Sequence, residues 1–263
     1  MTTDGDDERA LVLRLRAAGC VFAEEEAALL REAASGADLD ALVDRRVAGE
    51  PLEHLLGWVD FAGMRVRVAP GVFVPRRRTS YLVDLAAGYA AGLGRPPVVV
   101  DLCCGSGALG LVVAVRCPGT ELHAVDVDEA AVACAARNLE AVAGRTYCGD
   151  LVDPLPAALR RRVDLLLANV PYVPTDSVAL MPPESRDHEP RHTVDGGADG
   201  LDVLRRVAAL APAWLAPGGR LLVETSEAQG DAAAEAARAA GLEAVVQRSE
   251  EHDATVLVGH APG

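Results

Sequence analysis

Lysine is absent from this chain of 263 residues, and all 25 of its basic residues are arginine. Without lysine the protein cannot form a lysine Schiff base or anchor pyridoxal phosphate. A nucleotide-binding P-loop would also lack the lysine that contacts phosphate. The missing residue type therefore excludes three classes of chemistry.

Long apolar runs are also missing, since none approaches the roughly 20 residues that a membrane-spanning helix requires. The first residues, Met1 to Arg9, are acidic and polar, the opposite of a secretory signal. We therefore expect a cytoplasmic protein with no membrane partner. The acidic start, Asp4 to Glu8, is expected to be a disordered tail.

Positive charge is scarce relative to negative charge, and the formal net charge is −14. A surface of that sign repels phosphate backbones. We therefore expect no tight binding to nucleic acid. The run Arg76-Arg77-Arg78 is the exception, because it could contact RNA phosphates or an acidic partner, or be a solvated hairpin end.

Metal-binding patterns are weak. The six cysteines include no Cys-x-x-Cys pair, so we expect reduced and mostly buried thiols. His188-Glu-Pro-Arg-His192 matches the H-E-x-x-H zinc pattern, which works only when both histidines share one helix face. Pro190 within it makes a regular helix unfavourable, and we expect no metal site.

Three units are expected along the chain. Residues 7–48 have helical periodicity that suggests two or three short helices, and the alternation over Asp60–Val74 suits a β-hairpin. From about residue 80, strands alternate with helices. We predict a helical N-terminal domain that docks substrate over 1–55, a β-hairpin linker over 56–79 and a methyltransferase domain over 80–263.

The third unit has the strand pattern of a doubly wound α/β fold. Two strands near the C-terminus are separated only by a short polar link, and a terminal antiparallel hairpin on a parallel sheet is typical of class I methyltransferases. The seven expected strands are Val98–Leu102, Glu121–Val125, Arg145–Cys148, Val163–Ala168, Arg220–Glu224, Leu242–Arg248 and Thr255–Gly259. The alanine-rich stretch 232–240 is expected to be a surface helix.

A glycine loop, Asp101-Leu-Cys-Cys-Gly-Ser-Gly-Ala-Leu-Gly110, directly follows the first buried strand. Its glycines allow a sharp turn and close approach of the backbone to a ligand. The literal G-x-G-x-x-G pattern also fits a dinucleotide site. Asp101, four positions before the first glycine, favours S-adenosylmethionine (SAM), because a carboxylate suits the free ammonium group of that ligand.

Two further acids end the next strands. Asp126 lies 21 residues beyond Gly105, a spacing that suits a carboxylate accepting hydrogen bonds from ribose hydroxyls. Asp128 is a competing candidate, more often a helix cap. Asp150 could accept a hydrogen bond from an adenine amino group while Leu151 packs on the ring; the alternative is that Asp150 only begins a helix.

The tetrapeptide Asn169-Val170-Pro171-Tyr172 follows the fourth strand, at the strand end where ligands bind in such sheets. An amide nitrogen is a poor nucleophile because its lone pair is delocalised. Two acceptors for its two N–H bonds would aim that lone pair at a methyl group, and the Asn169 side chain and the Val170 carbonyl could supply them. Pro171 would stiffen the turn and Tyr172 could stack on the planar group.

These motifs make the chain resemble the HemK/PrmC-type protein glutamine N5-methyltransferases, which methylate the glutamine of a Gly-Gly-Gln motif in release factors. The resemblance covers about residues 40–260. It also includes Gly49-Glu-Pro-Leu, Leu56-Gly57, Val74-Pro75-Arg76 and Glu189-Pro-Arg with Asp195-Gly-Gly-Ala-Asp-Gly-Leu201. It implies a substrate site at Asn169, Val170, Pro171 and Tyr172, and SAM contacts at Thr79, Asp101, Cys103, Gly105, Ser106, Gly107, Asp126, Asp150, Leu151 and Asn169.

Two departures from that family separate this chain from its usual pattern. The family usually has Asn-Pro-Pro-Tyr, whereas position 170 is valine here. The family also has Pro-Arg-Pro-Glu-Thr-Glu after the hairpin, whereas this chain has Pro75-Arg-Arg-Arg-Thr-Ser80, in which Thr79 is retained but both acids are lost. The chain looks like an actinobacterial-style paralogue.

The favoured function is methyl transfer from SAM to a protein glutamine, in a release factor or another translation protein, with S-adenosylhomocysteine as product. An N6-adenine or small-molecule amine methyltransferase is the alternative, because an amino group on a planar ring poses the same problem. From another class, an NAD-dependent oxidoreductase or a non-catalytic SAM-binding module stays open.

Overall fold

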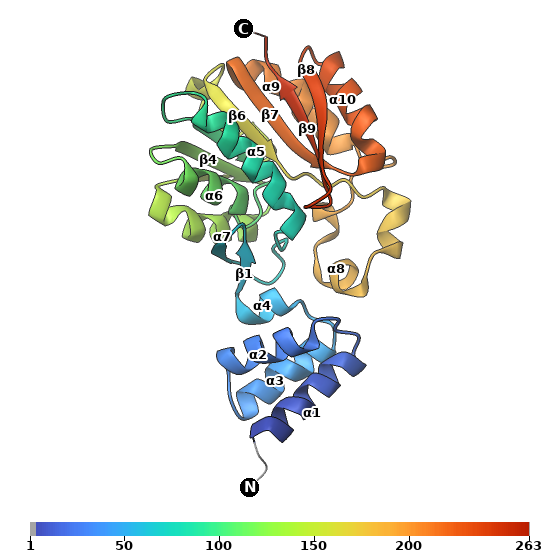
Figure 1. Cartoon of the computed structure of the whole chain (residues 1–263). Coiled ribbons are helices and arrows are strands. Elements are labelled where there is room, and N and C mark those ends of the chain that lie inside the picture. Colours follow the sequence, from blue (N-terminus) through green and yellow to red (C-terminus); the bar gives the residue numbers. More distant parts are fainter. Residues whose placement is uncertain (1–3, 263) are drawn as a thin grey trace.

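The computed structural model describes residues 4–262, and Figure 1 shows helices at the N-terminal end joined to a larger α/β body. The N-terminal helices are α1 (Asp4–Ala17), α2 (Ala23–Ala33), α3 (Ala37–Val47) and α4 (Leu52–Leu56). Leu15, Ala27 and Leu30 are fully buried between them. The helical periodicity of residues 7–48 is thus confirmed.

The expected disordered tail at Asp4 to Glu8 is wrong, because these residues form the first turns of α1. Leu11 and Leu15 bury one face of this helix against α2. Glu8 also accepts a hydrogen bond from Arg31 at 2.8 Å. Acidic residues are favourable at the start of a helix, where the helix dipole is positive.

A two-stranded hairpin, β1 (Trp58–Phe61) and β2 (Met64–Arg67), links the helices to the α/β body. The hairpin lies earlier than the expected Asp60–Val74, because its two-residue turn falls at Ala62 and Gly63, both with positive φ. Residues 68–76 form no strand, because a turn at Pro70 and Gly71 interrupts them and the Val72 amide donates to the Ala69 carbonyl. Val72 and Val74 bury alternate side chains there, which explains why the segment looks like a strand in the sequence.

The α/β body contains a seven-stranded sheet in the order β5-β4-β3-β6-β7-β9-β8. Five neighbouring strands are parallel, and β9 runs antiparallel to both β7 and β8. This confirms the predicted class I architecture with its terminal antiparallel hairpin. The strands are β3 (Val98–Leu102), β4 (Glu121–Asp126), β5 (Arg145–Cys148), β6 (Val163–Ala168), β7 (Leu215–Thr225), β8 (Glu243–Ser249) and β9 (Ala254–His260).

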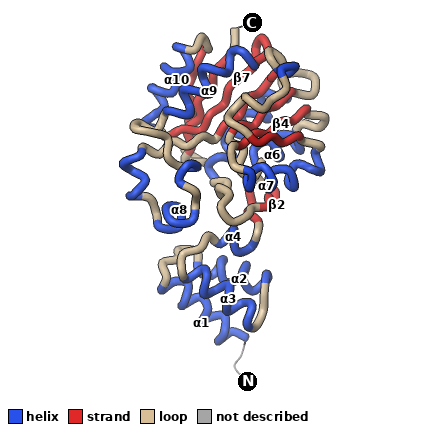
Figure 2. Tube along the Cα trace, turned by 180° about the vertical axis from the view of Figure 1, so that it is seen from behind, coloured by secondary structure: helices blue, strands red, loops and turns tan. Residues whose placement is uncertain are grey.

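Helices cover both faces of this sheet, as the view from behind shows (Figure 2). Successive residues of β3 enter opposite cores, so that Val100 packs on one side and Val99 on the other. The longer helices are α5 (Ser80–Ala91), α6 (Ala108–Arg116), α7 (Glu129–Leu139), α9 (Asp202–Trp214) and α10 (Gly230–Ala239). The alanine-rich α10 lies at the surface but buries Ala233, Ala234 and Ala237 against the sheet.

A strap between β6 and α9 contains a 3-10 turn (Thr175–Leu180), the short helix α8 (Pro183–His188) and a second 3-10 turn (Arg191–Thr193). His188 ends α8, and Pro190 separates it from His192 in the next turn. The two histidines of the H-E-x-x-H match therefore do not share a helix. In the part of the chain that the structure describes, no helix is long and apolar enough to cross a membrane.

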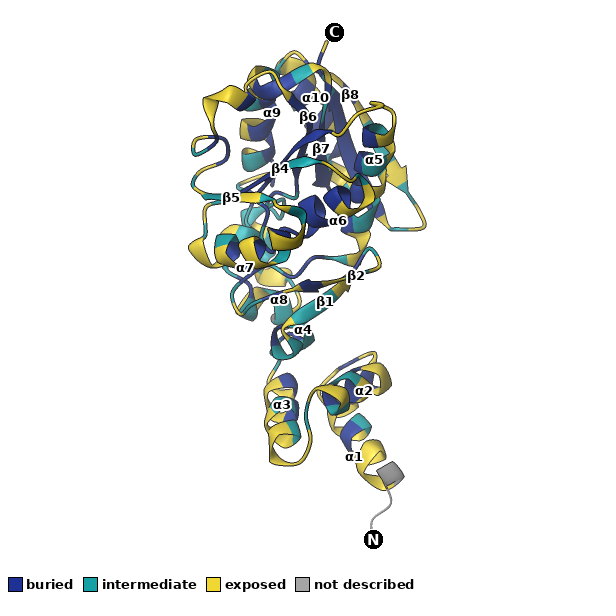
Figure 3. Ribbon diagram, turned by 90° about the vertical axis from the view of Figure 1, so that its left-hand side faces the viewer, coloured by how far each residue is buried: buried dark blue, intermediate teal, exposed yellow. Residues whose placement is uncertain are grey.

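Burial follows these layers, with the sheet dark and the outer faces of the N-terminal helices exposed (Figure 3). A buried ion pair joins α2 to α3: Arg46 Nε lies 2.6 Å from Glu26 Oε2, and both side chains are about one-tenth exposed. Removing one partner of a buried pair leaves an uncompensated charge. This buried ion pair therefore holds α2 against α3 in the helical unit.

We expect Arg46→Ala to destabilise the chain by about 3–5 kcal/mol, because Glu26 would be left buried and unpaired. Chemical denaturation of the full chain measures this change. Arg14→Ala is the matched control, since Arg14 and Asp44 form an exposed pair that contributes at most about 1 kcal/mol. Equal losses in the two variants would contradict the assignment.

Candidate active site

One cavity of roughly 1130 Å³ lies at the carboxyl ends of β3, β4, β5 and β6. Such strand ends form the ligand-binding edge in open α/β sheets. The volume suits a small-molecule site and leaves room for a second group. The glycine loop, the acids after β4 and β5, the tetrapeptide after β6 and the strap all contribute lining residues.

The glycine loop forms the floor of this cavity between β3 and α6. Gly105 has φ +53°, and a Cβ at this position would meet nothing closer than the Phe73 carbonyl at 4.0 Å. The backbone is therefore open to a ligand here. Cys103 also has a positive φ, and burial raises the pKa of its thiol to about 12, so the thiol stays protonated.

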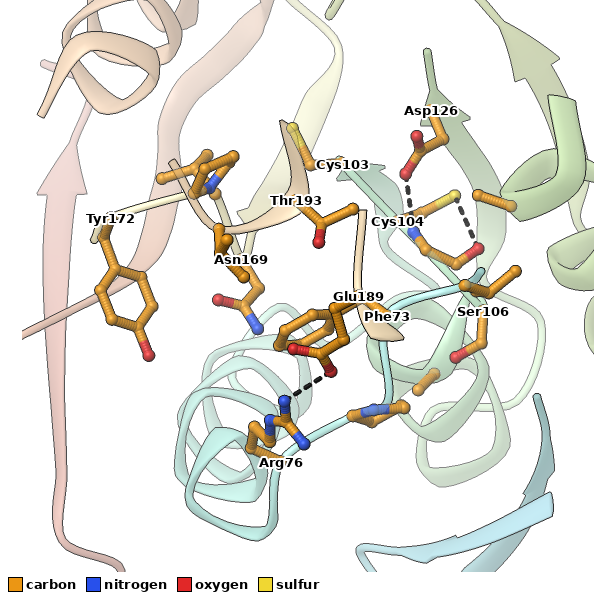
Figure 4. A pocket seen from close by; sticks show the side chains of 18 of the residues that line it. Phe73, Arg76, Cys103, Cys104, Ser106, Asp126, Asn169, Tyr172, Glu189 and Thr193 are labelled. Atoms are coloured by element: carbon orange, nitrogen blue, oxygen red, sulfur yellow. Dashed lines mark hydrogen bonds and ion pairs between the residues drawn. The ribbon is translucent and has the colours of Figure 1, made fainter. Parts of the chain in front are cut away.

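Asp126 ties the end of β4 to the glycine loop. Its Oδ2 accepts a hydrogen bond from the Gly105 amide at 2.8 Å, and its Oδ1 accepts one from the Asp128 amide at 3.0 Å. Figure 4 shows this carboxylate beside the loop. Asp128 instead caps α7 by accepting from the Ala130 amide at 2.7 Å, which is the helix-cap role weighed for it.

Asp101 lies behind the cavity wall rather than among its lining residues. Its Oδ2 accepts from the Gly110 amide at 2.9 Å, and its buried Oδ1 has no partner within residues 4–262. Burial, partly offset by that hydrogen bond, raises the pKa of Asp101 to about 7. Thr79 is also buried outside the lining, and its hydroxyl and that of Ser106 have no partner in the described chain.

Asp150 and Leu151 line the cavity at the end of β5. Asp150 pairs with Arg206 of α9 at 2.5 Å, and both side chains are about half exposed. Leu151 is buried and has φ +48°, an unusual conformation for a leucine. The turn therefore directs an acid and an apolar side chain to the same cavity.

The tetrapeptide lies opposite the glycine loop. Asn169 points into the cavity between Tyr172 and the loop (Figure 4). Within the described residues, neither the Asn169 side chain nor the Val170 carbonyl has a hydrogen-bond partner, whereas the Val173 carbonyl accepts from Gly196. Two acceptors are therefore left available at adjacent residues.

The backbone of Tyr172 is held from the far side by Gln229. The Gln229 Nε2 donates to the Tyr172 carbonyl at 2.9 Å and to the Asp199 carbonyl at 2.8 Å. A Cβ at Gly200 would lie 2.2 Å from the Tyr172 carbonyl, so only glycine fits there. The segment 195–201, noted in the sequence as a family motif without a role, thus packs directly beneath the tetrapeptide.

Sequence reasoning missed Gln229 and the side of the cavity formed by the strap. Ser226 and Gln229 form a capping box before α10, a pattern that would have predicted a helix start but not its contact with Tyr172. Glu189 is buried and pairs with Arg76 at 2.5 Å (Figure 4). Two of the three arginines in the run 76–78 therefore pair with buried acids of the chain, although both side chains stay partly exposed.

These features define a class I methyltransferase of the SAM-dependent kind. A family model for the methyltransferase small domain matches residues 69–181. The chain is also 38% identical to a release factor glutamine methyltransferase of Streptomyces coelicolor over 220 residues, 79% of this chain and 78% of that one. The chain therefore belongs to the release factor glutamine methyltransferase family.

Other relatives agree with this membership. A release factor glutamine methyltransferase of Bordetella pertussis is 38% identical over 80% of this chain and 77% of its own length. Among solved structures, a T. thermophilus 16S rRNA N2 G1207 methyltransferase in complex with AdoMet and guanosine has a TM-score of 0.56, at 21% identity over 78% of this chain and 49% of that one. That likeness shows the fold alone.

We expect Asp101→Asn to remove a pH dependence of stability. The pKa of Asp101 is raised on folding, so the native state binds the proton more tightly than the unfolded state does. The stabilisation that this proton provides is therefore lost as pH rises from about 4 through about 7. The wild type should lose up to a few kcal/mol over this range that the variant retains. Denaturation of both proteins at pH 5 and pH 8 measures it; parallel pH profiles would contradict it.

Proposed function

We propose that this protein transfers a methyl group from SAM to the side-chain amide nitrogen of a glutamine in a peptide-chain release factor, within its Gly-Gly-Gln motif. The observation that carries the proposal is the pair of unpartnered acceptors at Asn169 and Val170, in the same cavity as the glycine loop. The names of its relatives support the same substrate class.

The residues of the cavity fit SAM, which when bound supplies a methyl group on a positively charged sulfur. The open backbone at Gly105 admits a ligand, and Asp126 has carboxylate lone pairs to spare for ribose hydroxyls. Asp150 and Leu151 would face adenine. Asp101 and Ser106 belong to this loop, and their buried Oδ1 and hydroxyl have no hydrogen-bond partner within residues 4–262, which leaves two polar atoms available beside the donor site.

On the substrate side, the Asn169 side-chain oxygen and the Val170 carbonyl would accept the two amide N–H bonds of the glutamine. These contacts hold the planar amide so that its nitrogen lone pair faces the methyl group, which is catalysis by positioning. Pro171 fixes the turn, and the Tyr172 ring supports the amide plane. Burial and the nearby Glu224 raise the pKa of Tyr172 to about 12, so its hydroxyl stays neutral.

No strong base is needed at this site. The nitrogen forms a bond to carbon as the sulfur–carbon bond breaks, and it then releases one proton to water. The products are N5-methylglutamine and S-adenosylhomocysteine. Accordingly, the side chain of residue 170 is not required, since only its backbone carbonyl takes part.

We expect Asn169→Ala to lower kcat on the order of 100-fold or more, because it removes one acceptor that aims the amide. SAM affinity should stay nearly unchanged. Turnover of a release factor with labelled SAM, together with calorimetric SAM titration, measures both quantities. Val170→Pro is the matched control and should retain most activity, because the Val170 amide donates no hydrogen bond among the described residues.

Normal turnover by Asn169→Ala would contradict the proposed role of Asn169 as an acceptor for the substrate amide. Loss of SAM binding instead would assign Asn169 to the cofactor site. Duplex RNA and free adenosine, offered in the same assay, test the alternative substrates. Methylation of either one in place of the release factor would overturn the proposed substrate.

We expect Asp126→Ala to weaken SAM binding by about 2–3 kcal/mol, because charge-assisted hydrogen bonds to the ribose are lost. Asp128→Ala is the control, because Asp128 caps α7. It should cost about 1 kcal/mol of stability and leave SAM affinity unchanged. Calorimetry and thermal unfolding separate the two effects, and the reverse pattern would exchange the roles of the two acids.

A further inference from the structure

Arg78 connects three segments that are far apart in the sequence. It lies in the 3-10 turn Arg77–Thr79 that precedes α5. Its Nε donates to Glu224 Oε1 at the end of β7 over 3.1 Å, and its Nη2 donates to the Tyr172 hydroxyl. The Tyr172 hydroxyl in turn donates to Glu224 Oε1 at 3.5 Å. The three groups therefore form a closed set of hydrogen bonds.

Glu224 gives this set its stability. Its side chain is 2% exposed, and within the described chain Arg78 is its ion-pair partner. A carboxylate buried without a cation is strongly destabilising. Arg78 is thereby held in one place, and its planar fork can keep two acceptors in a fixed geometry.

Without Arg78, the Tyr172 side chain would keep within the described residues only the long 3.5 Å hydrogen bond from its hydroxyl to Glu224. Gln229 and Gly200 hold the carbonyl of Tyr172, but they do not contact its hydroxyl. Rotation about the side-chain torsions would still move the ring. Arg78 lies 94 residues before Tyr172 in the sequence, and its contact restrains the hydroxyl end of the Tyr172 side chain.

We propose that Arg78 is a positioning residue for methyl transfer, which acts by fixing the Tyr172 ring through its hydroxyl. The proposal rests on the proposed function, in which that ring supports the glutamine amide. Arg78 does not act on the methyl donor, because its two contacts with protein lie on the tetrapeptide side of the cavity. Its effect should therefore appear in turnover and not in SAM affinity.

A double-mutant cycle tests this coupling. Arg78→Lys keeps a positive charge beside Glu224 but lacks the fork that reaches both partners. We expect it to lower kcat about tenfold on a release factor, with SAM affinity and thermal stability nearly unchanged. In a Tyr172→Phe background the same change should cost no more than about twofold. Arg78→Gln with Glu224→Gln provides a neutral version, should the single variant fold poorly.

Arg220→Lys is the matched control. The Arg220 guanidinium also lies over a tyrosine ring, 4.1 Å from the centroid of Tyr89, but outside the cavity lining. It should leave kcat unchanged. A tenfold loss that persists in full in the Tyr172→Phe background would overturn the proposal, as would an equal loss of SAM affinity.

A spectroscopic measurement keeps this inference separate from the proposed function. The chain has four tyrosines, so fluorotyrosine labelling gives few ¹⁹F signals, and Tyr172→Phe identifies the signal of Tyr172. We expect one narrow Tyr172 signal in the wild type and a broadened or split signal in Arg78→Lys. An unchanged signal would refute the positioning role. An inactive wild type would refute only the proposed function, because the ¹⁹F signals do not depend on turnover.

Discussion

The register of the parallel strands is the constraint on which the site depends. β3 pairs with β4 on one side and with β6 on the other, with Leu102 opposite both Val125 and Ala168. The three strands therefore end at the same level, and the residues that follow them must meet there. A one-residue slip would turn the buried side chains of a strand to the opposite face. The same apolar packing that fixes the register thus brings the glycine loop, Asp126 and Asn169 together.

Much of this arrangement could be predicted because it depends on local patterns. Short apolar runs such as Val98–Leu102 and Val163–Ala168 mark buried strands, and the strand ends place the tetrapeptide and the glycine loop on one edge. The sequence pattern places the hairpin too late, because burial alternates at Val72 and Val74 although no strand of residues 4–262 pairs with them. Alternating burial of side chains indicates extended backbone, but a β-strand also requires hydrogen bonds to a neighbouring strand.

The contacts that could not be predicted join residues remote in sequence. Arg78 meets Glu224, 146 residues later, and Gln229 meets the Tyr172 carbonyl, 57 residues earlier. Neither side chain has a local pattern that names its partner, and arginine runs more often face solvent. The assignment of roles to Thr79, Asp101 and the other cofactor candidates stays a prediction, as do the boundaries of the three units.

Arginine supplies the cations that compensate most of the buried acids of this lysine-free chain, and Asp101 is the exception within the described residues. Arg95 binds Asp164 with two nitrogens at 2.8 and 2.7 Å, Arg46 binds Glu26 with two nitrogens, and Arg76 binds Glu189. Each of these acids is largely buried. A guanidinium can satisfy two acceptors at once in a fixed plane, which an ammonium group cannot do. The arginines therefore join elements as well as balancing charge.

Two of these arginines, Arg46 and Arg76, also contact the strap. Arg46 of α3 lies 3.6 Å from Glu184 of α8, and Arg76 contacts both Ser185 and Glu189. Ser185 and Glu189 in turn line the cavity. The strap also pairs with the residue that follows the tetrapeptide, through the bridge between Val173 and Asp195. Arginine contacts thus join α3 to α8, and they join the strap to the segment that precedes α5.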